Sequence, residues 1–270
     1  MDIKEQFSEY GYVIVNNKEV IKDIKKFYCD IAFFFSIVLE DDTRFDNYVD
    51  EIRKGLENED ILLIDNSIQK AMLKVQSVDR KLISKLYDMG TRPNKFITGE
   101  KLFFNKEISK ITNKFFEYKG IDNPLLVKPQ KGETLHVFTP GKDDYIHNLP
   151  IHQDFQYLGQ SSDQLTFWLF LSGDINTGGV RVFKGSHKNG AVKCEINKNN
   201  VYEVSQNIID SVDLETAVDF GGEQFQLVAI DSLLLHQSIH SLSKSSTRLT
   251  YIWRISNINS KNRVKFAKSF

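Results

Sequence analysis

The chain has 270 residues, which is enough for one large domain or two small ones with a substantial core. Its 35 basic and 36 acidic residues give a formal net charge of -1, so there is no electrostatic basis for binding nucleic acid or an acidic membrane surface. Cys29 and Cys194 stand far apart and outside any metal-ligand spacing. We therefore expect reduced thiols in a cytoplasmic protein.

The first part of the chain is predicted to be helical from about residue 18 to 120. Its opening residues lack the basic and apolar regions of a secretion signal, so export is not expected. The apolar run 31–39 is too short to cross a membrane, which takes about 20 residues, and we predict a buried helix there. Apolar residues recur on one helical face at Ile68, Met72 and Val75, then at Leu82, Leu86 and Met89.

From about residue 125 the chain turns to short runs rich in Val, Ile, Phe and Thr, typical of strands. Many short strands separated by turns indicate a closed or two-sheet β structure. No repeat or low-complexity linker divides the chain, so residues 1–270 are treated as one domain. The predicted strands are 125–128, 134–138, 149–154, 164–171, 180–184, 192–196, 200–204, 217–220, 223–235 and 248–255.

The segment His152-Gln153-Asp154 carries the first candidate site residues, and His236 and Arg248 follow far downstream. Two histidines and one carboxylate form the ligand set that holds a non-haem iron(II) on one face and leaves the other face open. On a strand, His152 and Asp154 would share one face. His236 is predicted to end a long apolar strand over 226–235, which could bring it across a barrel to meet them.

Three longer segments resemble the phytanoyl-CoA dioxygenase family of iron(II)/2-oxoglutarate oxygenases. "FSEYGYVIVNN" (7–17) is similar to the family's opening, and "LTFWLFLSGDINTGGVRVFKGSHKNG" (165–190) to its central signature. "HQSIHSLSKSSTR" (236–248) resembles its C-terminal signature. The resemblance implies that residues of about 125–256 form a double-stranded β-helix, also called a jelly roll or cupin-like fold. The chain would then be mainly β, with the helical part of about 18–120 packed on this core.

The resemblance also implies the cofactors and their contacts. His152, Asp154 and His236 would bind Fe(II), and 2-oxoglutarate and O2 would take the remaining positions. Arg248 would anchor the far carboxylate of 2-oxoglutarate through its planar two-point fork. Ser238 and Trp168 would lie beside the same cosubstrate. Where the family often has a Lys or an amide side chain upstream, this chain offers Thr139 or His136, and the choice between them stays open.

Two other histidines compete for roles at this site. His240 is the rival of His236 as a ligand, but His236 directly follows the apolar run and stands two positions before Ser238, as the family pattern asks. His187 lies in a Gly-Ser-His loop that is preceded by Lys184, where proline is usual, and we expect it to be structural.

The implied reaction is hydroxylation of a small polar metabolite or biosynthetic intermediate, coupled to decarboxylation of 2-oxoglutarate. Related halogenases have a small residue at the position of Asp154, so halogenation is not expected here. Desaturation or epimerisation by the same class of oxygenase is an alternative, and so is a non-catalytic jelly-roll protein that binds a metal or ligand. The expected partner is a small molecule, with no nucleic acid or membrane, and the sequence does not predict an oligomeric state.

Overall fold

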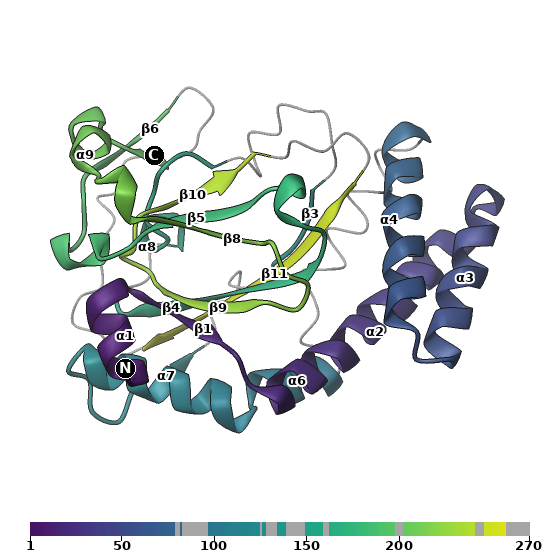
Figure 1. Ribbon diagram of the computed structural model, residues 1–270, viewed down its shortest axis with the longest axis horizontal. Coiled ribbons are helices and arrows are strands. Elements are labelled where there is room, and N and C mark those ends of the chain that lie inside the picture. The colour runs from purple at the N-terminus through teal and green to yellow at the C-terminus, as the bar shows by residue number, and fades with distance from the viewer. Residues whose placement is uncertain are drawn as a thin grey trace.

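Helices lead the chain and antiparallel strands follow (Figure 1). The computed structural model describes residues 1–78, 82, 97–124, 126–127, 134–138, 149–158, 162–197, 202–240 and 246–257. The predicted order of helices, then antiparallel strands, is confirmed, although helices take a larger share than "mainly β" implies. The helices are α1 Ile3–Tyr10, α2 Lys18–Glu40, α3 Asp46–Glu57, α4 Ile61–Val78, α6 Ile97–Phe103, α7 Lys106–Tyr118, α8 Phe155–Leu158 and α9 Gln206–Ser211. Short 3-10 helices are η1 Thr43–Phe45, η3 Ile175–Thr177, η4 Ser186–Asn189 and η5 Leu214–Thr216.

Local signals explain where the first helices begin and end. Asp2 and Glu5 form a capping box at the start of α1, and Asn17 accepts hydrogen bonds from two backbone N–H groups at the start of α2. Gly11 ends α1 with φ at 81°, a conformation that favours glycine. A Cβ on Gly11 would lie 2.5 Å from Nδ1 of His187, so close packing also requires glycine here.

The strands form two main sheets. The larger has the order β1-β9-β4-β11-β2, with β3 also paired to β11, and the smaller has the order β10-β5-β8; β6 pairs with β7 apart from both. All of these pairings are antiparallel. The strands are β1 Tyr12–Val15, β2 Leu126–Val127, β3 Thr134–Phe138, β4 Gln164–Ser172, β5 Gly179–Phe183, β6 Cys194–Ile196, β7 Tyr202–Val204, β8 Ala217–Phe220, β9 Leu227–Asp231, β10 His236–Ile239 and β11 Arg248–Asn257.

The large sheet is buried on both faces, and β4 shows how. Every residue of β4 is buried. Leu165, Phe167 and Leu169 pack in a cluster with the helices, whereas Trp168 and Phe170 pack in a second cluster with residues of the small sheet. The period-two alternation of a strand therefore directs one set of side chains to the helices and the other to the space between the sheets.

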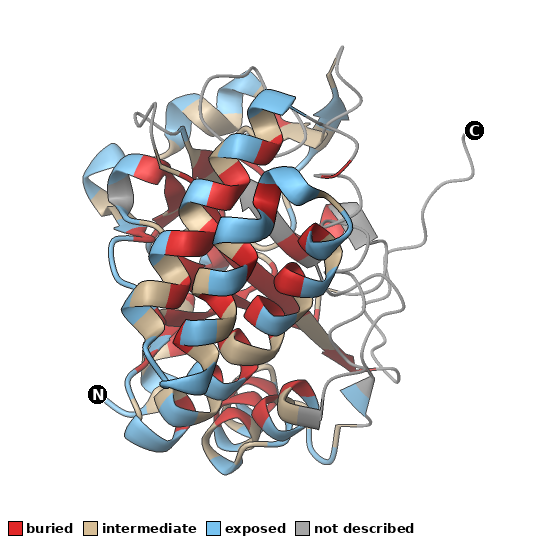
Figure 2. Ribbon diagram, turned by 90° about the vertical axis from the view of Figure 1, so that its right-hand side faces the viewer, coloured by how far each residue is buried: buried red, intermediate tan, exposed pale blue. Residues whose placement is uncertain are grey.

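The helices cover the outer face of the large sheet. In Figure 2 they carry bands of buried and exposed residues along their length. The predicted buried helix over 31–39 lies within α2. Ile31, Phe35 and Leu39 are buried there, although Phe33 and Ile37 are exposed. Of the predicted repeat at Leu82, Leu86 and Met89, only Leu82 lies inside the described residues, and it is buried.

Two of the predicted strands are wrong. Residues 149–154 form no strand, and only His152 makes an isolated bridge. The predicted strand over 223–235 is broken after Asp231, so His236 begins β10 instead of ending a long strand. The break is a turn in which the Asp231 carboxylate accepts a hydrogen bond from Leu233 N at 2.9 Å, a capability of aspartate that competes with the sheet.

Candidate metal centre

His152, Asp154 and His236 come together as a buried cluster. One candidate ligand atom from each residue lies within 4.8 Å of the others. His152 and His236 are a reciprocal backbone pair, with His152 N donating to His236 O at 2.9 Å and His236 N to His152 O at 3.1 Å. Asp154 Oδ1 lies 3.7 Å from His236 Nε2. This spacing suits ligation of one ion by all three side chains.

Both imidazoles are held in the orientation that a metal ligand needs. Nδ1 of His152 lies 2.7 Å from Pro150 O, and Nδ1 of His236 lies 2.9 Å from Leu234 O. Because a carbonyl can only accept, each Nδ1 carries the hydrogen, which leaves the Nε2 lone pair for a metal. His236 Nε2 is buried and makes no hydrogen bond with the described residues. Burial, reinforced by the neighbouring His236, lowers the pKa of His152 to about 3, so His152 is neutral at physiological pH.

Asp154 is held as a carboxylate by two donors from neighbouring strands. Burial alone would raise its pKa, but the charge of Arg254, together with the hydrogen bond from Thr166, outweighs burial and holds the pKa well below its usual range. Arg254 Nη2 lies 3.1 Å from Oδ1, and Thr166 Oγ1 donates to Oδ2 at 2.6 Å. The set of two neutral nitrogens and one anionic oxygen matches the donor types of a non-haem Fe(II) site.

Gln153, between the two ligands of the first motif, anchors the loop that carries them. Its side chain is fully buried. Nε2 donates to Gly190 O at 2.9 Å and to Leu233 O at 2.6 Å, while Oε1 accepts from Val192 N at 2.9 Å. The backbone pair with His236 thus positions His152, and the side-chain hydrogen bonds of Gln153 fix the loop that continues to Asp154.

Arg248 begins β11 and is only 1% exposed. Burial lowers the pKa of its guanidinium to about 9, and the group remains a cation at neutral pH. Alternation along β11 puts Arg248 on the same face as Ile252 and Arg254. Ile252 packs in the cluster between the two sheets, so this face is the one toward the metal centre. The opposite face, with Leu249, Tyr251 and Trp253, packs on the helices, as its apolar sequence predicts.

The other predicted cosubstrate residues have the following positions. Trp168 lies on the inward face of β4, and its ring meets that of His236 edge-on at 5.8 Å between centroids. Trp168 Nε1 is buried and makes no hydrogen bond with the described part of the chain. Ser238 shares the buried face of β10 with His236, and its hydroxyl accepts from Leu149 N at 3.0 Å. Thr139 lies outside the described residues, and of His136 only the backbone, in β3, is described.

The two competing histidines occupy different surroundings. His240 is exposed, whereas His236 is fully buried within the cluster. His187 is buried in η4 against the ring of Tyr118, at 6.2 Å between centroids. The contacts of Asp154 with Thr166 and Arg254 were not predicted. The sequence places Arg254 on the same strand face as Arg248, which points to the site and is a signal for the contact of Arg254 with Asp154. No sequence pattern predicts the contact of Thr166 with Asp154.

Solved structures with the same fold include three enzymes. The non-haem monooxygenase ThoJ has a TM-score of 0.53 at 14% identity, with 95% of this chain and 77% of that chain covered. EctD from S. alaskensis, solved with 2-oxoglutarate and 5-hydroxyectoine, has a TM-score of 0.53 at 11% identity, and the match covers 94% of this chain and 74% of EctD. The epimerase SnoN, solved with Fe3+, alpha-ketoglutarate and nogalamycin RO, has a TM-score of 0.50 at 10% identity, and the match covers 94% of this chain and 82% of SnoN.

This chain shares its fold with non-haem iron and 2-oxoglutarate oxygenases. No family model matches the sequence, and no curated protein does. Membership of the phytanoyl-CoA dioxygenase family therefore stays a prediction. The neighbours have been crystallised with Fe3+ and with 2-oxoglutarate, and the cluster of His152, Asp154 and His236 has the donor set that fits iron.

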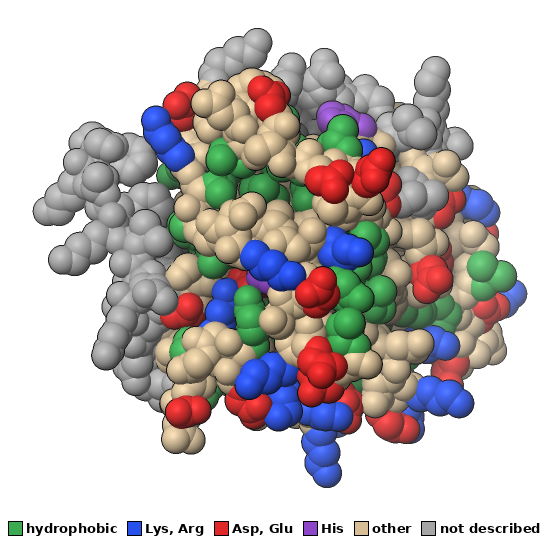
Figure 3. Space-filling view, turned by 60° about the vertical axis from the view of Figure 1, so that its left-hand side comes forward, with side chains coloured by type: hydrophobic (Ala, Val, Ile, Leu, Met, Phe, Trp, Pro, Cys, Tyr) green, Lys and Arg blue, Asp and Glu red, His purple; other side chains and the backbone are tan. Residues whose placement is uncertain are grey.

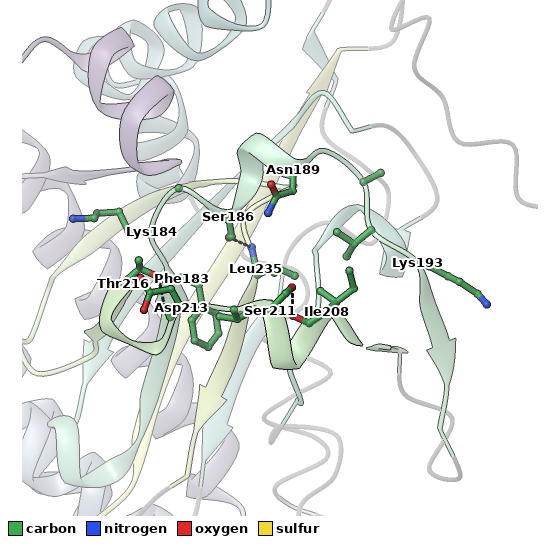
Figure 4. Close-up of a pocket in the computed structure, with 14 residues that line it drawn as sticks. Phe183, Lys184, Ser186, Asn189, Lys193, Ile208, Ser211, Asp213, Thr216 and Leu235 are labelled. Atoms are coloured by element: carbon green, nitrogen blue, oxygen red, sulfur yellow. Dashed lines mark hydrogen bonds between the residues drawn. The ribbon is translucent and has the colours of Figure 1, made fainter. Parts of the chain in front are cut away.

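Among the described residues, no other group of three or more His, Cys, Asp or Glu side chains lies close enough together to hold a metal ion. A surface hollow of about 710 Å³ is lined by residues that include Phe183 and Leu235 (Figure 4). Leu235 faces the opposite side of the small sheet from His236, so the sheet separates this hollow from the metal centre. Lys184 and Lys193 at its rim point away from it in Figure 4.

Charges of both signs are interspersed over the face drawn in Figure 3, in keeping with the net charge of -1. Among the described residues, no helix combines the length and apolar character that a membrane span requires.

Proposed function

We propose that this protein is an Fe(II)- and 2-oxoglutarate-dependent dioxygenase that hydroxylates a small polar metabolite or biosynthetic intermediate. The observation that supports this most strongly is the triad itself. Two buried imidazoles and a buried carboxylate each bring a ligand atom within 4.8 Å of the others, and each imidazole has its Nδ1 committed to a backbone carbonyl. We further propose that the two sheets form a double-stranded β-helix, the jelly roll of cupin-like proteins.

His152, Asp154 and His236 would hold Fe(II) on one face of its coordination sphere and leave the opposite face for 2-oxoglutarate and O2. With these bound, such a site supplies decarboxylation of 2-oxoglutarate to succinate coupled to oxidation of a substrate C–H bond. The chain's own contribution is to fix the ligands, to keep the His152 imidazole neutral and to exclude water through burial.

Arg248 would bind the far carboxylate of 2-oxoglutarate. The inward face of β11 puts this guanidinium on the side of the metal centre, and its planar fork can pair with a carboxylate through two hydrogen bonds. Trp168 would line the cosubstrate, and Ser238 and Thr139 would add hydroxyl groups. The free state of Cys29 and Cys194 agrees with a reducing compartment, and a cytoplasmic location is part of the proposal.

The test is substrate-independent formation of succinate. Wild-type protein loaded with Fe(II) under argon, supplied with 2-oxoglutarate and then exposed to O2, is expected to release succinate. His152→Ala, Asp154→Ala and His236→Ala should each abolish it, because a triad lacking one member does not hold the metal. His240→Ala, at the exposed histidine, is the matched control and should behave as wild type.

Product analysis separates the alternatives. Hydroxylated product supports the proposal, whereas desaturated or epimerised product would place the protein in the same class with a different outcome. A wild-type protein that binds Fe(II) but forms no succinate would be a non-catalytic metal-binding protein of this fold. If His240→Ala loses iron while His236→Ala retains it, the ligand assignment is wrong.

A further inference from the structure

Resting on the proposed metal site, we propose that Thr166 and Arg254 are positioning residues that restrict Asp154 to ligation through one oxygen. Their purpose is to keep three coordination positions of the iron open, two for 2-oxoglutarate and one for O2. If both oxygens of Asp154 bound the metal, only two positions of an octahedron would remain.

The two residues approach Asp154 from adjacent strands. Thr166 on β4 and Arg254 on β11 are directly paired in the antiparallel register, and both lie on the inward face. Thr166 is fully buried, and the Arg254 side chain is 12% exposed. The pair therefore forms a fixed base under the carboxylate, built from strands whose outward residues pack on the helices.

Each donor takes a different oxygen of Asp154. Oδ1 is the oxygen 3.7 Å from His236 Nε2, and Arg254 Nη2 reaches it at 3.1 Å. Oδ2 accepts the hydroxyl hydrogen of Thr166 at 2.6 Å. Hydrogen bonds to a charged acceptor are stronger than those between neutral groups. With both oxygens tethered, rotation of the carboxylate about Cβ–Cγ would break two such bonds, so Oδ2 stays on Thr166 and Oδ1 stays the oxygen nearer His236.

A purely structural role predicts a different result from a positioning role. If Thr166 only provided a hydrogen bond to a buried carboxylate, its loss would lower stability and leave the metal-loaded protein with normal affinity for 2-oxoglutarate. If Thr166 restrains Oδ2, its loss lets Oδ2 enter the metal's coordination sphere. 2-Oxoglutarate must then displace that oxygen, while Fe(II) itself still binds.

The experiment compares Thr166→Val with Thr166→Ser, since valine matches the shape of threonine and serine keeps its hydroxyl. Fe(II) affinity is measured anaerobically without 2-oxoglutarate. Affinity for 2-oxoglutarate is then measured on the Fe(II)-loaded protein through the visible charge-transfer absorption of the chelate. We expect Thr166→Val to retain Fe(II) and to weaken 2-oxoglutarate binding at least about tenfold, the lower end of the loss in metal affinity or activity that usually follows when a metal ligand loses its hydrogen-bond partner. Thr166→Ser should stay within about threefold of wild type, a small fraction of that loss.

Controls separate folding from positioning. Thr112→Val on α7 replaces another buried threonine, whose hydroxyl bonds to Ile108 O at 2.8 Å, far from the site along the chain. It should leave both affinities unchanged. Arg254→Met and Arg254→Lys form a second pair: lysine keeps a donor for Oδ1 and should recover part of the 2-oxoglutarate affinity lost with methionine.

The outcomes are distinct. Normal 2-oxoglutarate affinity in Thr166→Val, or an equal loss in the serine variant, overturns the positioning role while the proposed function stands. A wild-type protein that binds no Fe(II) would instead remove the proposed function and the positioning role with it.

Discussion

Replacing Gln153 by leucine tests how much its side-chain hydrogen bonds contribute to holding the loop that carries His152 and Asp154. Leucine has a similar volume but can neither donate nor accept. The change removes the bonds to Gly190 O, Leu233 O and Val192 N. At about 0.5–1.5 kcal/mol of net stabilisation per bond, the three together contribute about 1.5–4.5 kcal/mol. Against a typical unfolding free energy of about 5–15 kcal/mol, the variant should still fold.

The assay is chemical denaturation of the metal-free protein followed by circular dichroism, with Fe(II) affinity measured separately. Fe(II) binding should weaken as well, because His152 and Asp154 flank Gln153. Gln156→Leu is the matched control from the same loop. Its side chain donates to Val192 O at 2.9 Å and accepts from Gln153 N at a longer 3.3 Å, so we expect about half the loss. An unfolding free energy for Gln153→Leu within about 0.5 kcal/mol of wild type would refute this account of the loop.

Three further predictions concern two residues of the site, Arg248 and Asp154, and one structural histidine, His187. Arg248→Ala should raise the required 2-oxoglutarate concentration at least about tenfold, since hydrogen bonds between charged groups contribute roughly 1.5–3 kcal/mol. Arg248→Lys should recover part of this loss. Equal 2-oxoglutarate affinity in the wild type and both variants would remove Arg248 from the site. Asp154→Gly would vacate a coordination position and remove a negative charge, which would open a site for chloride. The wild-type protein, with the carboxylate in place, should give no chlorinated product by mass spectrometry even in high chloride. A chlorine isotope pattern in the wild-type product would overturn the assignment of Asp154. Burial lowers the pKa of His187, so the folded protein favours the neutral imidazole. Neutral His187 costs the folded state nothing above the unfolded pKa of about 6.5, but as the pH falls below that value the unfolded chain binds a proton more readily and the free energy of unfolding decreases. The unfolding free energy of His187→Gln should therefore fall less steeply than that of wild type between about pH 6.5 and 5, and parallel curves would contradict this.

The sequence predicted the elements that are set by local patterns. The alternation along β11 correctly separated an apolar face that meets the helices from a face that carries Arg248 and Arg254. Periodicity likewise located the helices, and the spacing of the histidines selected the three residues that cluster. These features depend on neighbours in the chain, which a single sequence contains.

The errors arose where side chains compete with backbone pairing. His152-Gln153-Asp154 alternates as a strand would, yet Gln153 uses its amide to bind three backbone groups from distant segments. The run ending at Leu235 is mostly apolar, yet its Asp231 accepts a hydrogen bond from Leu233 N and pairs with Lys119 at 2.6 Å. The contact of Thr166 with Asp154 depends on how a loop meets a sheet, and no local pattern encodes it.

The divided burial of β4 has a consequence for engineering. Its odd-numbered residues pack on the helices, while Thr166, Trp168 and Phe170 face the space between the sheets. A mutant library at Trp168 and Phe170 would change the side chains around the candidate metal centre, since the ring of Trp168 contacts that of His236. The same diversity at Leu165, Phe167 and Leu169 would disturb the packing of the helices on the large sheet. One face of a single strand can thus be varied to alter the surroundings of the site, and the other to alter how the helices are held.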